Sequence, residues 1–113
     1  MRSFKIRSLT IVLAMCLRVI AFAADNMTVE QKDKTFLYQG GKVDTLKVKL
    51  GETVQFKNMD SFFHNVFSLS ETKMFDLGSY PQGQFRAVTF DKKGKVDVEC
   101  AIHPLMHMVV EVK

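Results

Sequence analysis

The residues best suited to chemistry lie close to the C-terminus, in the stretch CAIHPLMHM that begins at Cys100. Cys100, His103 and Met106 place thiolate, imidazole and thioether donors within a few positions of one another, and His107 and Met108 follow directly. Two imidazoles, one thiolate and a weak axial methionine form the ligand set of a mononuclear blue-copper site. The stretch therefore predicts a soft-metal site that needs a second imidazole.

The second imidazole must be His64 or His107, because the sequence holds three histidines. His107 follows His103 so closely that both rings and the Cys100 thiolate would crowd one loop. His64 stands after an irregular segment, at the start of a predicted strand, where a folded sheet can bring it beside the C-terminal loop. We favour His64 on these grounds.

The N-terminus has the pattern of a secretory signal peptide. A basic start, RSFKIR, precedes the apolar run LTIVLAMCL and the small-residue pattern AFA. A bilayer-spanning helix needs about 20 apolar residues, more than this run supplies. We therefore interpret residues 1–24 as a signal peptide cleaved after Ala23 or Ala24. Residues 25–113 would then form the mature domain, which is periplasmic and has no stable insertion in the membrane.

Cleavage would change both the charge and the cysteine content of the chain. The leader carries four of the 16 basic residues and none of the 12 acidic ones, so the mature domain has no formal net charge. This balance gives no reason to expect a nucleic-acid partner. Cys16 leaves with the leader, and Cys100 remains as a lone cysteine in an oxidising compartment. A bound metal would occupy it; a buried free thiol is the alternative.

Alternating apolar and polar residues predict short strands through most of the mature domain. The pattern occurs at about 27–31, 46–50, 54–58, 64–69, 84–90, 95–100 and 110–112. The segment 70–83 is expected to be less regular, with at most one helical turn over 71–75. Val96, Val98 and Cys100 share one strand face, which points the thiol inward. Seven or eight short strands at this spacing predict an all-β fold, an antiparallel β-sandwich with Greek-key connections.

Three motifs resemble, in chain order, those of the cupredoxin family in its plastocyanin and amicyanin branch. They are LGETVQFKN from Leu50, HNV from His64, and the pattern Cys-x-x-His-Pro-x-Met from Cys100 to Met106. The resemblance covers essentially all of residues 25–113. It implies a cupredoxin-like fold with one type 1 copper ion per chain. The ligands implied by matching the motifs are His64, Cys100, His103 and Met106.

The axial methionine has two candidates within this resemblance. Plastocyanin-like loops separate the histidine from the methionine by four residues, which selects Met108. Amicyanin-like loops separate them by two, with a proline after the histidine, which selects Met106. The order His103-Pro104-Leu105-Met106 matches the shorter loop, so we favour Met106 and keep Met108 as its rival. The resemblance also implies that the backbone N–H of Asn65 donates a hydrogen bond to the Cys100 sulfur.

Three neighbours of the ligands depart from the family pattern. Phe63 and Ile102 stand where prolines are common, and Glu99 stands where an aromatic residue is frequent. Because the departures lie beside the ligands, they bear on the reduction potential and the spectrum more than on copper binding.

The resemblance implies a periplasmic carrier of single electrons, not an enzyme, which acts as a monomer. Redox protein partners would dock transiently near His103, on an apolar patch that includes Pro104, Leu105, and Phe62 or Phe63. The main alternative is a copper-binding protein for copper delivery or homeostasis. Zinc also accepts Cys and His ligands, and an enzyme would need an open copper position, which two nearby methionines disfavour.

Overall fold

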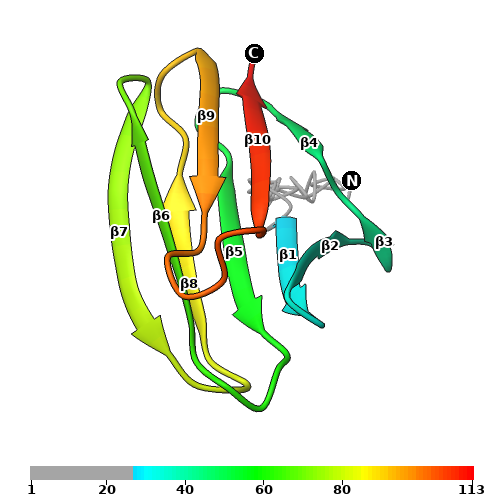
Figure 1. Ribbon diagram of the computed structural model, residues 1–113. Helices are drawn as coiled ribbons and strands as arrows, with labels where there is room; N and C mark the ends of the chain where they lie inside the picture. Colours follow the sequence, from blue (N-terminus) through cyan, green and yellow to red (C-terminus); the bar gives the residue numbers. More distant parts are fainter. Residues whose placement is uncertain (1–26) are drawn as a thin grey trace, which may run out of the picture.

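Ten β-strands in two five-stranded sheets form the part of the chain that the structure describes, residues 27–113 of a computed structural model (Figure 1). The predicted signal peptide lies outside these residues. The first sheet has the spatial order β3 (Gly41–Lys42), β2 (Thr35–Tyr38), β1 (Met27–Lys32), β5 (Thr53–Asn58) and β8 (Phe85–Thr89). The second has the order β4 (Thr45–Val48), β10 (His107–Val112), β9 (Gly94–Glu99), β6 (His64–Ser70) and β7 (Lys73–Tyr80).

The all-β sandwich predicted from the alternation is confirmed, with more strands than the expected seven or eight. The additional strands include β2 and β3, which follow the turn after β1. Most neighbouring strands are antiparallel, but β1 runs parallel to β5, and β10 runs parallel to β4. Within residues 27–113 no helix is long and apolar enough to cross a membrane.

The helical turn considered at 71–75 is wrong, because most of this segment belongs to the strand β7. Phe75 and Leu77 are partly buried against the core, while Met74 and Asp76 between them are exposed, so the strand alternation continues. Gly78, with φ of 70°, does not end the strand. The register shifts here from Asn65–Ser79 to Phe67–Asp76, so Leu77 and Gly78 of β7 face the single residue Val66 of β6, and Gly78 belongs to a β-bulge within β7.

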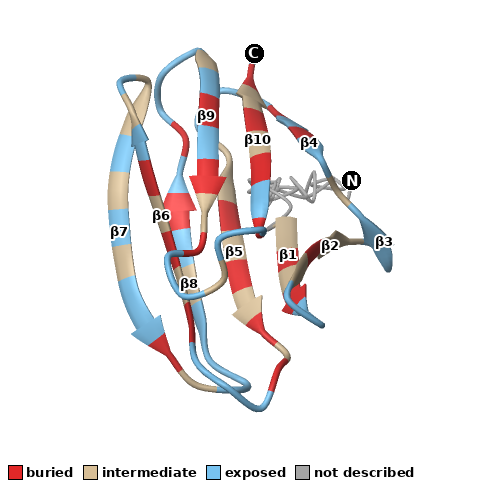
Figure 2. Ribbon diagram, viewed as in Figure 1, coloured by how far each residue is buried: buried red, intermediate tan, exposed pale blue. Residues whose placement is uncertain are grey.

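The core lies between the two sheets and is filled by alternate residues of the strands. Figure 2 shows this alternation along β9 and β10, where buried and more exposed residues follow each other. Val96 and Val98 are fully buried, and Cys100 directly after β9 is 2% exposed, which confirms the predicted inward thiol. Phe36 and Phe56 pack edge to face across the first sheet, with ring centroids 6.3 Å apart.

Three connections meet at one end of the sandwich, toward the lower half of Figure 1: the β1–β2 turn, the β5–β6 loop and the β9–β10 loop. Hydrogen bonds link these connections to one another and to the start of β6. The turn donates to Asp60 in the β5–β6 loop, and Ala101 in the β9–β10 loop donates to Asn65 at the start of β6. This end of the fold therefore brings together residues that are far apart in the sequence.

Candidate metal centre

His64, Cys100 and His103 bring their donor atoms within 4.8 Å of one another. The Cys100 Sγ lies 3.7 Å from His64 Nδ1 and 3.8 Å from His103 Nδ1. Metal–sulfur and metal–nitrogen bonds of about 2.3 Å and about 2.0 Å, opened at about 120°, would separate sulfur from nitrogen by about 3.7 Å. The spacing therefore fits a single metal ion held by two imidazoles and one thiolate.

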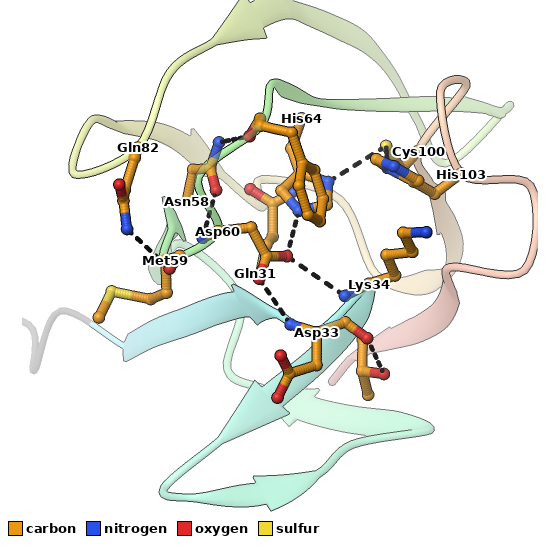
Figure 3. Close-up of polar contacts among 12 residues, drawn as sticks. Gln31, Asp33, Lys34, Asn58, Met59, Asp60, His64, Gln82, Cys100 and His103 are labelled. Carbon is orange, nitrogen blue, oxygen red and sulfur yellow. Dashed lines mark hydrogen bonds and ion pairs between the residues drawn. The ribbon is translucent and has the colours of Figure 1, made fainter.

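His64 begins β6 and is completely buried. Its Nδ1 faces the Cys100 sulfur, and its Nε2 lies 2.7 Å from an Asp60 carboxylate oxygen (Figure 3). The Phe62 ring packs against the imidazole, with centroids 5.2 Å apart. The structure thus places His64 with Cys100 and His103, as the sequence reasoning favoured. Both ring nitrogens of His64 have a contact, Nδ1 with the Cys100 sulfur and Nε2 with Asp60.

Asn65 joins the two segments that carry the predicted ligands. Its side-chain oxygen accepts a hydrogen bond of 2.7 Å from the backbone N–H of Ala101, the residue after Cys100. Its backbone carbonyl accepts a longer bond, 3.5 Å, from the Gln31 side chain. Sequence reasoning expected Asn65 to connect these segments through its backbone N–H and the sulfur, whereas this contact runs through its side chain. The bond from the Asn65 backbone to the sulfur stays a prediction.

The β9–β10 loop closes on itself between Cys100 and Met106. The Met106 N–H donates to the His103 carbonyl at 2.9 Å, and the Cys100 N–H donates to the Met106 carbonyl at 3.3 Å. Met106 is 2% exposed and belongs to the same closed loop as Cys100 and His103. Met108 is also buried, but it lies within β10, where it pairs with Val98 of β9. The assignment of Met106 as the axial ligand, with Met108 as its rival, stays a prediction.

His103 lies at the border between the buried site and the surface. Its side chain is half-buried, and its ring lies 4.8 Å from that of His64 and 5.0 Å from that of Phe62, measured between centroids. Burial lowers the pKa of His103, and the nearby His64 and Lys34 add to the decrease, while Asp60 opposes it. The neutral imidazole, which is the form that binds metal, is therefore favoured at neutral pH.

In the metal-free folded protein we expect the His103 ring to titrate below its ordinary value of 6.5. Because the folded state then binds this proton less tightly than the unfolded state, the stability that His103 contributes is fully present above the unfolded pKa of 6.5 and is lost as the pH falls from there through the lower folded-state pKa. The measurement is the NMR chemical shift of the ring protons against pH, in the native protein and in urea. A native midpoint at or above the unfolded one would contradict the expectation.

Sequence reasoning did not identify Asp60, whose carboxylate contacts Nε2 of His64, the ring nitrogen that does not face Cys100. Asp60 is 7% exposed and accepts hydrogen bonds from the backbone N–H groups of Asp33 at 2.7 Å and Lys34 at 3.2 Å, besides its contact with His64 (Figure 3). Burial tends to raise the pKa of Asp60, but the hydrogen bonds from His64, Asp33 and Lys34 together lower it below 3.8. Asp60 is therefore ionised at neutral pH.

His107, the other candidate for the second imidazole, points away from the cluster. It begins β10 with its side chain 48% exposed, and its Nε2 lies 2.9 Å from the Asp97 carboxylate on β9. Its strand neighbour Met108 faces the core, so His107 faces outward.

Comparison with known proteins identifies the same type of site. The family model of copper binding proteins of the plastocyanin/azurin family matches residues 25–113. A Cu(I) structure of an amicyanin variant has a TM-score of 0.68 at 24% identity, covering 78% of this chain and 82% of that chain. A reduced Cu(I) form of a second amicyanin variant at pH 4 has a TM-score of 0.68 at 25% identity, covering 79% and 83%.

A third similar structure is an enzyme. The Cu-containing nitrite reductase (NirK) from Thermus scotoductus SA-01 has a TM-score of 0.68 at 24% identity, covering 78% of this chain but 22% of that chain. The similarity therefore concerns the fold of one part of the reductase. Among curated proteins no significant match was found.

The sandwich and its buried sulfur–imidazole cluster define a mononuclear copper protein with a cupredoxin fold. The chain belongs to the plastocyanin/azurin family of copper-binding proteins and is similar to amicyanin, and its cofactor is one copper ion.

Proposed function

We propose that this protein is a periplasmic carrier of single electrons, with His64, Cys100, His103 and Met106 as the copper ligands. The observation that carries the proposal is the position of the donor set. Cys100 and His64 are buried, while the half-buried His103 borders an exposed apolar surface. When bound, copper supplies a one-electron couple between Cu(II) and Cu(I). The signal peptide predicted at 1–24 supports the periplasmic location.

The protein's own residues would keep the ligands in place during electron transfer. The Asn65–Ala101 hydrogen bond joins the two ligand segments, and the bonds between Cys100, His103 and Met106 close the loop. Phe62 packs against both imidazoles. A site held from several sides changes little in geometry when its charge changes, which suits electron transfer better than release of copper to another protein.

The surface beside His103 supports a transient docking site for redox proteins. Leu105 is 98% exposed, and Ile102 and Phe62, whose ring packs against His103, are 46% and 37% exposed. We call these three residues, together with Pro104, the apolar rim. Exposed apolar groups around a ligand edge allow a partner to approach closely without forming a long-lived complex. We propose that the carrier works as a monomer.

The proposal predicts that electron self-exchange between two copies depends on the apolar rim. In Leu105→Glu, like charges would oppose each other when two rims meet, so we expect self-exchange to slow about tenfold or more at low salt. The visible spectrum should stay unchanged, because Leu105 is not a donor. NMR line broadening in mixtures of the Cu(I) and Cu(II) forms measures the rate.

Met74→Glu is the matched control for this experiment. Met74 is 69% exposed, and it lies in β7 near the β6–β7 hairpin, at the other end of the sandwich from the site (Figure 1). We expect the control to exchange electrons at the wild-type rate. Equal slowing in both variants would argue against docking at the rim. A wild-type protein without a reversible one-electron couple, or one that loses copper rapidly to a chelator, would instead favour copper delivery.

A further inference from the structure

The Asp60 carboxylate is a buried charge that the proposed copper ligands do not explain. It is 7% exposed and lies behind His64, on the side away from the Cys100 sulfur. Burying a carboxylate is costly unless hydrogen bonds compensate. Three N–H groups supply this compensation, from Asp33, Lys34 and the His64 ring.

The β1–β2 turn is shaped to receive this carboxylate. Asp33 and Lys34 both have left-handed backbones, with φ of 53° and 56°, a conformation that costs roughly 1–2 kcal/mol for a residue with a side chain. In this conformation both backbone N–H groups point at Asp60 (Figure 3). Successive N–H groups arranged in this way form an anion-binding concavity.

Asp60 is also held from its own loop. Its backbone N–H donates to the Asn58 side-chain oxygen at 2.8 Å, and the Asn58 amide donates in turn to the Phe62 carbonyl at 2.8 Å and the Tyr80 carbonyl at 3.0 Å. The carboxylate therefore has a fixed position relative to the His64 ring.

The contact with Asp60 determines which ring nitrogen of His64 has a lone pair available to bind a metal. A neutral imidazole has one N–H and one lone pair, and an ionised carboxylate can only accept. Nε2 must therefore carry the hydrogen that bonds to Asp60, which leaves the Nδ1 lone pair directed at the Cys100 sulfur, 3.7 Å away. A carboxylate on the far nitrogen of a ligating histidine also increases the basicity of the ligand.

We propose that Asp60 is a positioning residue that acts through His64: it fixes the Nδ1-binding form of the ring, and its buried negative charge favours Cu(II) over Cu(I). This inference rests on His64 being a copper ligand, as proposed above. Its consequence is a reduction potential lower than the same site would have without the carboxylate.

Asp60→Asn tests the charge with little change in shape. The amide oxygen can still accept a hydrogen bond, but the negative charge is lost. Loss of such a partner typically changes metal affinity by 10–100-fold. We expect the ratio of Cu(II) to Cu(I) affinities to fall about tenfold, which corresponds to a rise of about 59 mV for a one-electron couple. Voltammetry of the copper-loaded protein at pH 7 and fixed salt measures the shift.

Asp33→Asn is the matched control, because it removes the same charge from the exposed side chain of a residue in the turn that holds Asp60. We expect its potential to equal that of the wild type within error. An unchanged or lower potential in Asp60→Asn would overturn the proposal, and so would equal shifts in both variants.

A measurement on the wild-type protein keeps the inference testable if Asp60→Asn does not fold. In the metal-free protein, ¹⁵N NMR should show His64 with its hydrogen on Nε2, and that hydrogen should exchange slowly with solvent. A hydrogen on Nδ1 would overturn the proposal. Because this result needs no copper, it separates failure of the Asp60 role from failure of the electron-carrier function, which would appear as a missing one-electron couple.

Discussion

Replacing Cys100 with serine is expected to abolish the intense visible absorption of the copper-loaded protein. That blue or green band arises from charge transfer between a thiolate and Cu(II), and a serine hydroxyl is neither soft nor ionised at neutral pH. Cys100 is the free cysteine within residues 27–113, and it is buried beside both imidazoles. Absorption spectra of the oxidised, copper-loaded wild type and Cys100→Ser measure the effect.

His107→Ala is the control for this prediction. His107 is an imidazole near the same loop, but it faces outward and pairs with Asp97. Its removal should leave the band in place. A band that persists in Cys100→Ser, or that disappears in His107→Ala, would contradict the proposed ligand set.

The second large effect is expected from Met106→Leu, compared with Met108→Leu. Exchange of methionine for leucine nearly conserves volume and usually costs less than about 1.5 kcal/mol in a core. Both side chains are buried, so the two variants should lose similar stability. The axial donor also tunes the reduction potential and the spectrum of a blue-copper site. We therefore expect Met106→Leu to shift both strongly and Met108→Leu to leave both close to wild type.

Voltammetry and absorption spectra of both variants test this assignment, with thermal unfolding as the measure of stability. A strong shift in Met108→Leu, with none in Met106→Leu, would assign the axial position to Met108. Met108 would then have to leave its place opposite Val98 in the sheet.

Much of the fold was predictable because a half-buried strand alternates apolar and polar residues along its own sequence. The alternation in β9 predicted the buried Val96 and Val98, and it also predicted the inward thiol of Cys100. β7 was misjudged because 70–83 was expected to be irregular, whereas the strand continues through a bulge at Leu77 and Gly78. The parallel pairing of β1 with β5 was not predictable either, since it depends on contacts between distant segments.

The site was predictable where its residues are close in sequence. Cys100 and His103 were identified from their spacing, and His64 was favoured from its place before a predicted strand and then implied by the family resemblance. The role of Asp60 was missed, because its partners Asp33 and Lys34 come from a turn far earlier in the chain. An acidic residue in the same irregular segment as a candidate ligand histidine was the one local signal that could have drawn attention to it.

The position of β10 links closure of the metal-site loop to long-range strand pairing during folding. This strand ends the chain, yet it lies inside its sheet between β9 and β4, and it pairs with β4 from Val109–Thr45 to Val112–Val48. Cys100, His103 and Met106 all precede it, in the loop that it closes. Long-range pairing of this kind makes folding slow. Closure of the loop that carries Cys100, His103 and Met106 therefore depends on this late pairing, and until β10 inserts, the Cys100 thiol is not enclosed by the loop.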